Sequence, residues 1–324
     1  MRRMRILTPA LLMFVAGACA HAPASTESAP SAPAATAQAP AASGAGAEPG
    51  KSAAAELPFM EPPGKPIPGT LPVKRADGLM GEGKHAEALA LYKQALDEGN
   101  TAKGTAYSAA CAAALLGQKQ EALRLLTLAA EHGFRDAKWM QQDEDLASLR
   151  AEPAFTALAQ RMPTMPERYP GENAEIQRMF KEDQADRSPA PSTPEGWKAV
   201  SARDDQRRAR AKELVKEGAL KNGADYLAAA FIFQHGGTQE DYAMARELGA
   251  EAARRGHPGG MWIAAAAWDR WLMHAGRPQR FGTQYKFDAQ TKQPKLYDVD
   301  PSVSDEERAR WGFPPLAEIP QVLR

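Results

Sequence analysis

Cysteine is nearly absent from this chain of 324 residues, which contains only Cys19 and Cys111. Cys19 lies in an N-terminal segment that is predicted to be processed, so Cys111 is the one thiol of the folded part and no intramolecular disulfide can brace it. Cys111 lies in the alanine-rich run SAACAAALL. This context predicts a small core residue on a helix rather than a reactive thiol.

Net charge is absent as well. Forty Lys and Arg residues balance forty Asp and Glu residues, so no chain-wide field draws nucleic acid or acidic substrates. The most basic stretch, RDDQRRARAKELVK at 203–216, has interleaved acids and no stacking aromatics, which is typical of a solvated helix face. The sequence therefore predicts no nucleic-acid partner.

The spacings that hold metals or activate nucleophiles are missing too. The sequence has no H-E-x-x-H, H-x-x-E-H, C-x-x-C or G-x-S-x-G pattern, and its six histidines are scattered. Asp143 and Asp145 lie close in sequence, but no ligand-rich continuation follows, and helix N-capping is the better interpretation. We therefore predict neither a metal nor a cofactor.

One stretch, GLMGEGKH at 78–85, has nearly the spacing of a phosphate-binding loop. His85 stands where Ser or Thr must ligate magnesium, and the preceding LPVKRAD is not a buried apolar strand. An internal repeat gives another explanation, since Gly83 recurs as Gly117 with no lysine after it. Both glycines are expected to end a helix in the left-handed conformation, leaving Lys84 and His85 as solvated turn residues.

Further positions recur at the same spacing, and these carry a resemblance to the tetratricopeptide repeat. Ala76, Ala88, Ala95 and Tyr92 recur as Ala110, Ala122, Ala129 and Leu126. A period of about 34 residues is that of this family, in which small residues let the two helices of an antiparallel pair approach closely. The stretch 130–162, with its D-x-D-L and P-x-F elements, resembles the closing segment of such arrays. Residues 73–162 are therefore predicted to form a tetratricopeptide-like module that binds a protein or peptide in its groove.

The first nineteen residues have the pattern of an export signal. MRRMR is followed by a short apolar run that is too short to span a bilayer. The order Ala16-Gly17-Ala18-Cys19 resembles a bacterial lipobox, although leucine is usual where Ala16 stands. The resemblance implies lipidation of Cys19 and, because Ala20 follows, anchoring at the periplasmic side of the outer membrane. The alternative is plain cleavage to a soluble periplasmic protein. Residues 20–72, rich in Ala, Pro and Ser, are predicted to be a disordered tether.

Residues 171–324 read as a second, mostly helical domain. Helices are expected over 173–187, 197–218, 225–236, 239–257 and 258–276, with Trp262, Trp268 and Trp271 partly on a core face and a last helix at 304–311. Aromatic alternation predicts a hairpin pairing 281–287 with 295–299. The stretch around Glu240-Asp241-Tyr242 and Gly256-His257-Pro258 resembles a Sel1-type repeat, with His257 capping a helix C-terminus as a cation. The domain also resembles an uncharacterised bacterial family through G-R-P-Q-x-(Y/F)-G-T-Q, here residues 276–284, and that family has no activity to transfer.

The polar residues of this second domain are the candidate site. His235, Asp183 and Asp269 are the candidate acid–base residues, with His235 as a base beside either aspartate. The candidate ligand-binding residues are Arg187, Arg277, Gln279, Arg280, Thr283 and Gln284. If 280–285 is a strand, Arg280, Gly282 and Gln284 share one face. The structural alternative is that these groups tie the hairpin to the helices, and that Asp269-Arg270 pairs with Arg187 or Glu182.

These observations predict an all-α fold of antiparallel helix pairs with a small C-terminal β-hairpin. The expected function is that of a cell-envelope interaction or scaffold lipoprotein without catalytic activity, touching the membrane only through its lipid. The alternative is a small-molecule-binding or hydrolytic domain in residues 171–324, built on the polar cluster around Arg280.

Overall fold

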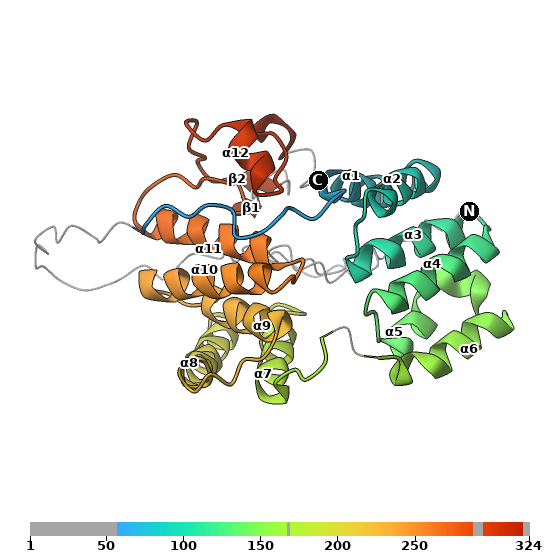
Figure 1. Cartoon of the computed structure of the whole chain (residues 1–324), viewed down its shortest axis with the longest axis horizontal. Helices are drawn as coiled ribbons and strands as arrows, with labels where there is room; N and C mark the ends of the chain where they lie inside the picture. Colours follow the sequence, from blue (N-terminus) through green and yellow to red (C-terminus); the bar gives the residue numbers. More distant parts are fainter. Residues whose placement is uncertain (1–56, 167–168, 288–293, 320–324) are drawn as a thin grey trace, which may run out of the picture. The chain divides into compact units, whose positions relative to one another are not determined.

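The computed structural model describes residues 57–166, 169–287 and 294–319, which are mostly helical (Figure 1). The predicted signal peptide, Cys19 and most of the predicted tether lie outside the described residues. The described chain forms two compact units. The repeat unit comprises 65–171 and 304–319, and the second unit comprises 57–64 and 172–303. None of the described helices is both long enough and apolar enough to cross a membrane.

The repeat unit begins with two consecutive helix pairs, which are followed by shorter helical elements. Its elements are α1 (Thr70–Gly81), α2 (His85–Asp97), α3 (Lys103–Leu115), α4 (Lys119–Glu131), α5 (Ala137–Gln142), η1 (Glu144–Leu149), α6 (Pro153–Arg161), η2 (Met162–Thr164), α12 (Asp305–Arg310) and η3 (Leu316–Glu318). Helix α1 packs on α2, and α3 packs on α4. This confirms the predicted antiparallel pairing of helices.

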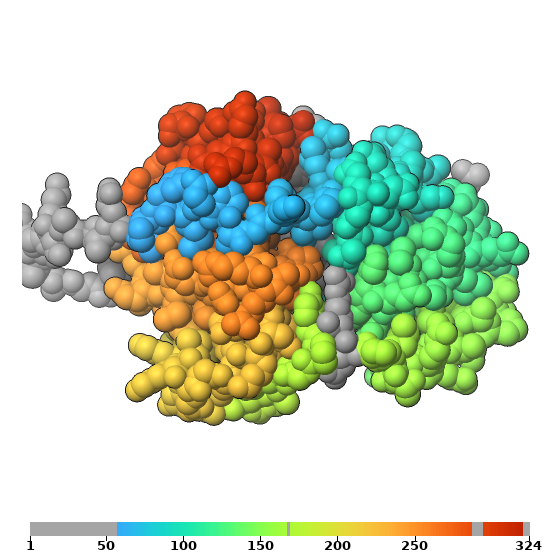
Figure 2. Space-filling view, in the orientation of Figure 1, coloured from blue at the N-terminus to red at the C-terminus, as the bar shows by residue number. Residues whose placement is uncertain are grey.

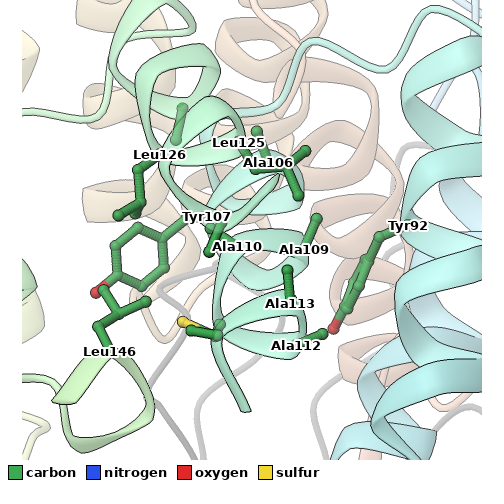
Figure 3. Close-up of a cluster of buried hydrophobic side chains, with 14 of the residues drawn as sticks. Tyr92, Ala106, Tyr107, Ala109, Ala110, Ala112, Ala113, Leu125, Leu126 and Leu146 are labelled. Atoms are coloured by element: carbon green, nitrogen blue, oxygen red, sulfur yellow. The ribbon is translucent and has the colours of Figure 1, made fainter. Parts of the chain in front are cut away.

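The packing repeats with the sequence. The three alanines of the first pair and their counterparts in the second pair are all fully buried, namely Ala76, Ala88, Ala95, Ala110, Ala122 and Ala129. Figure 3 shows Tyr92 against one side of the alanine-rich α3, and Leu126 beside Tyr107 of α3 on another side. Cys111 is a buried residue of α3, as predicted. Small side chains on α3 therefore let its neighbours approach from several sides.

Two glycines end the first helix of each pair in the same way. Gly83 and Gly117 have φ values of +74° and +73°, a conformation that residues with a Cβ adopt at a cost. The next residue closes each helix through its backbone N–H, from Lys84 to the Leu79 carbonyl and from Gln118 to the Ala113 carbonyl, both at 2.9 Å. The near-match to a phosphate loop is thus a helix C-cap.

The second unit is a stack of longer helices followed by a small sheet. Its elements are α7 (Ala174–Ala185), α8 (Pro194–Lys216), α9 (Gly223–Gln234), α10 (Gln239–Arg254), α11 (Gly260–His274), β1 (Tyr285–Phe287) and β2 (Pro294–Leu296). Helix α10 packs against both α9 and α11. A Cβ at Gly249 would lie 2.7 Å from Ile263 Cγ2 and 2.8 Å from the Ala264 nitrogen, so glycine permits the close crossing of α10 and α11.

The α10–α11 turn differs from its prediction in one detail. His257 was expected to act as a cation at the end of α10. Instead its Nδ1 accepts a hydrogen bond from the Gly259 N–H at 3.1 Å, which requires an unprotonated nitrogen. The helix is closed by the His257 backbone N–H, which donates to the Ala252 carbonyl at 2.9 Å.

The hairpin is shorter than the aromatic alternation predicted. Strands β1 and β2 pair antiparallel over three residues each, with Lys286 opposite Lys295. Residues 281–284 are not strand: Gly282 has φ +74° and Phe281 is fully buried. The expectation that Arg280, Gly282 and Gln284 share a strand face is therefore wrong, because this segment is a loop shaped by contacts with α11.

Candidate functional site

His235 and Asp183, two of the candidate acid–base residues, are in contact in the second unit. Asp183 lies near the end of α7, and His235 is the C-cap residue of the apolar helix α9. His235 Nδ1 lies 2.9 Å from Asp183 Oδ2 and 3.1 Å from Oδ1. The Asp183 side chain is 1% exposed, whereas that of His235 is 17% exposed. A sealed carboxylate therefore orients a ring that still reaches solvent.

Arg187 fixes Asp183 from the other side. Its Nη1 donates to Asp183 Oδ1 at 3.0 Å, and its Nη2 donates to Asp204 Oδ2 at 2.5 Å. Asp204 also accepts from Arg207 at 2.7 Å, so alternating charges link α7 to α8. The structure thus brings His235 into contact with Asp183, one of its two candidate partners, and places Arg187 beside the same carboxylate. Arg187 is occupied by two carboxylates, which makes it a positioning residue rather than a free ligand-binding group.

Burial and charge act in opposite directions on this pair. Burial lowers the pKa of His235, and although the Asp183 carboxylate raises it, the result is a lowered pKa, with Arg187 and Arg270 adding to the decrease. For Asp183, burial raises the pKa, but the hydrogen bond and charge of His235 and the charge of Arg187 outweigh it, and the pKa is lowered. Near neutral pH His235 is therefore an imidazole that donates from Nδ1 and can accept a proton at Nε2.

Two further arginines surround the end of α9. Arg270 donates to the Gln234 carbonyl and to Gln284 Oε1, both at 2.9 Å, and Arg208 donates to the His235 carbonyl at 3.1 Å. Cations are stabilised at a helix C-terminus, where carbonyl groups lack partners. The predicted pairing of Asp269-Arg270 with Arg187 or Glu182 is wrong, because Arg270 turns to the end of α9.

Asp269 has a different role from Asp183. It is fully buried in α11 and accepts hydrogen bonds from the backbone N–H groups of Arg280, Phe281 and Thr283 at 2.7–3.1 Å, and from the Thr283 hydroxyl at 2.8 Å. Burial raises the pKa of Asp269, and these donors only partly offset the effect. Asp269 therefore holds the 280–283 loop and does not reach His235.

The remaining predicted ligand-binding residues are mostly engaged in the same loop. Gln279 is fully buried, donates to the Gln284 and Tyr297 carbonyls at 2.9 and 3.1 Å, and accepts from the Gln284 N–H at 2.9 Å. The Arg280 guanidinium lies 4.9 Å from the centre of the Trp268 ring. Arg277 is exposed. These contacts match the structural alternative, in which the motif ties the loop to α11.

A third polar group lies inside the repeat unit and was not predicted as a group. Ligand-type atoms of Cys111, Asp143 and Asp145 lie within 4.8 Å of one another. Asp143 accepts from the Tyr107 hydroxyl at 2.8 Å and, as predicted for an N-cap, from the Asp145 N–H at 3.0 Å. Burial, then the nearby carboxylates, raise the pKa of Cys111, so it stays a protonated donor to Asp143. Cys111 and Asp143 lie 32 positions apart in the chain, so no signal of this contact was present in the sequence.

Comparison with protein-family models, with curated proteins and with solved structures gave no match. The function therefore has to be argued from the geometry of the chain itself.

Proposed function

We propose that this protein is a cell-envelope lipoprotein that acts by binding another protein or peptide, and that the repeat unit provides the binding surface. The supporting observation is the equivalence of its two helix pairs, whose alanine contacts and glycine caps recur at corresponding positions. Stacked helix pairs of tetratricopeptide or Sel1 type present extended surfaces to peptides and proteins. The resemblance of the second unit to an uncharacterised family adds no activity to this proposal.

The engagement of polar side chains within the fold favours binding over catalysis. Asp269 accepts from the Thr283 hydroxyl, Gln279 bonds to the loop backbone, and Arg187 is divided between two carboxylates. Residues used in this way stabilise a rigid scaffold. They are not positioned to contact a substrate.

Exposed apolar side chains on the repeat unit are the natural contact points. Trp139 of α5 is 38% exposed, and Leu115 and Leu116 at the end of α3 are 36% and 37% exposed. Tryptophan is enriched among the residues that dominate binding energy at interfaces. Trp197, in the second unit, is similarly exposed at 40% and therefore serves as a control position outside the repeat unit.

The test is site-specific photo-crosslinking of the full-length protein in its native cells. A photoreactive amino acid would replace Trp139 in one variant and Trp197 in the other. We expect one discrete cross-linked partner from position 139 and none from 197, and we expect Trp139→Ala to reduce co-purification of that partner by about tenfold or more, as for an interface hot spot. Identical products from both positions, or none from either, would exclude the repeat unit as the binding surface.

A second candidate function has one specific observation in its favour. The Asp183–His235 contact leaves Nε2 as a proton acceptor on a partly exposed ring, which is the arrangement of a general base. This version of the ligand-binding or hydrolytic alternative centres on His235 rather than on Arg280.

A further inference from the structure

A proline-rich segment that precedes α1 lies on the second unit. Residues 57–64, LPFMEPPG, are called the strap here. Figure 1 shows the start of the described chain, in blue, running along α11, and Figure 2 shows its atoms on the surface there. The strap belongs to the second unit, and the chain enters the repeat unit at Lys65. These residues fall in the stretch whose composition predicts a tether, yet they have a defined place.

The strap contacts a compact set of cationic and aromatic side chains. Arg246 Nη1 donates to the Pro58 carbonyl at 2.7 Å, and the same guanidinium lies 5.0 Å from the centre of the Trp268 ring. The Phe59 ring meets Trp268 edge-on at 5.7 Å between centroids. The Arg280 guanidinium lies 5.6 Å from the Phe59 ring. Arg246, Trp268 and Arg280 are called the strap site here.

Exposure differs sharply between the two sides of this contact. Arg246 and Trp268 are 2% and 4% exposed, whereas Phe59 is 58% exposed and no residue from 57 to 64 is buried. Arg246 Nε has no hydrogen-bond partner although it is buried. A segment that lies on a surface with none of its own residues buried can detach without opening a core.

The chemistry of the strap is that of an extended peptide ligand. Pro58, Pro62 and Pro63 restrict the backbone toward the polyproline II conformation, which reduces the entropy lost on docking. Domains that recognise proline-rich peptides use aromatic side chains in the same way. The hydrogen bond from the Arg246 guanidinium to the Pro58 carbonyl orients the peptide on the surface.

We propose that the strap site is a docking surface for extended, proline-rich peptides with an aromatic residue, and that residues 57–64 of the same chain occupy it as an intramolecular ligand. The surface lies on the second unit and is independent of the function proposed for the repeat unit. A peptide of the same chemistry from another protein competes with the strap for this surface, and its binding releases the segment that joins the N-terminal region to the folded units.

The test measures binding of a fluorescein-labelled peptide, LPFMEPPG, to full-length protein by fluorescence anisotropy. The wild-type chain is compared with Phe59→Ala and with a chain in which residues 57–64 are replaced by a Gly-Ser segment of equal length. A tethered ligand competes at a high effective concentration, so we expect the replaced chain to bind the peptide about tenfold or more tightly than wild type, with Phe59→Ala between them.

Matched controls locate the binding. In the chain with the replaced segment, Arg280→Gln should abolish binding, whereas Arg210→Gln, an arginine that pairs with Glu175 and Glu213 elsewhere in the second unit, should not. The peptide LPAMEPPG should not bind. Equal affinity in wild type and Phe59→Ala would overturn the proposal, and so would the lack of saturable binding to Phe59→Ala, which keeps every residue of the strap site and loses only an exposed ring.

Discussion

At the residue scale, two buried aspartates show that the neighbouring groups decide the direction in which a carboxyl pKa shifts. Asp183 and Asp269 are both nearly inaccessible, yet the pKa of Asp183 is lowered and that of Asp269 is raised. Asp183 accepts a hydrogen bond from His235, which is also protonated in the acidic range where Asp183 titrates, and it faces the positive charge of Arg187, so the carboxylate is favoured. Asp269 faces neutral N–H and O–H donors, which stabilise its charge less. Both aspartates were candidate partners for His235, and the sequence alone could not distinguish them, because Asp183 and His235 lie 52 positions apart in the chain.

The Asp183–His235 contact gives a prediction for pH. The folded state holds His235 neutral below its ordinary pKa of 6.5, so the unfolded chain binds more protons in that range. Stability therefore falls as the pH decreases below about 6.5, and the lowered pKa of Asp183 continues the loss at more acidic pH. NMR titration of the imidazole signals should give His235 a pKa below 6.5.

Replacing Asp183 separates the effect of its charge on the pKa of His235 from the effect of burial. Asp183→Asn removes the charge that raises the pKa of His235, so the pKa should fall further. Asp186→Asn is the matched control, since Asp186 pairs with Arg203 and Arg207 in the same charge cluster. A His235 pKa above 6.5 in the wild-type protein would mean that the Asp183 charge outweighs burial, and the site would then hold an imidazolium.

At the scale of helices and strands, the sequence predicted features set by nearby residues. It did not predict contacts between residues far apart in the chain. The repeat period predicted the helix pairs and their glycine caps because both depend on residues within one or two turns. The hairpin was predicted too long because Phe281 and Thr283 alternate like strand residues. Their positions are instead set by Asp269, which lies earlier in the chain on α11. The same limit explains why the Cys111–Asp143 contact was missed.

The close crossing of α10 and α11 gives a prediction about glycine. Gly249→Ala would place a methyl group 2.8 Å from the Ala264 backbone nitrogen, which can move only if the helices separate. We expect a loss of about 1–3 kcal/mol in unfolding free energy, as for other overpacked positions. Gly78 in α1 has nothing within 4 Å of its Cβ position, so Gly78→Ala should raise stability by about 0.5–1 kcal/mol. Urea unfolding of both variants measures this difference, and equal effects of the two substitutions would contradict the inferred crossing.

At the scale of the whole molecule, chain order and spatial grouping differ. The described chain begins on the second unit with the strap, forms α1 to α6 in the repeat unit, and then returns to the second unit at Glu172. A linear reading of composition placed residues 57–69 with the tether because prolines and glycines dominate there. Composition reports whether a segment can form its own core. It does not report whether the segment can dock on the core of another segment, as the strap does on Trp268.

If the proposed lipid anchor is present, the strap connects the membrane to the folded units. Lipidation of Cys19 can be tested without reference to the fold. If Cys19 is acylated, [³H]palmitate should label the wild-type protein and the protein should sediment with membranes. Cys19→Ser should lose the label entirely, because the thiol is the acceptor for the lipid. Cys111→Ser is the control and should keep the label, since that thiol is buried in α3. Undiminished labelling of Cys19→Ser would place any lipid elsewhere, whereas an unlabelled wild-type protein in the soluble fraction would favour the soluble periplasmic alternative, in which the strap joins the folded units to a free N-terminus.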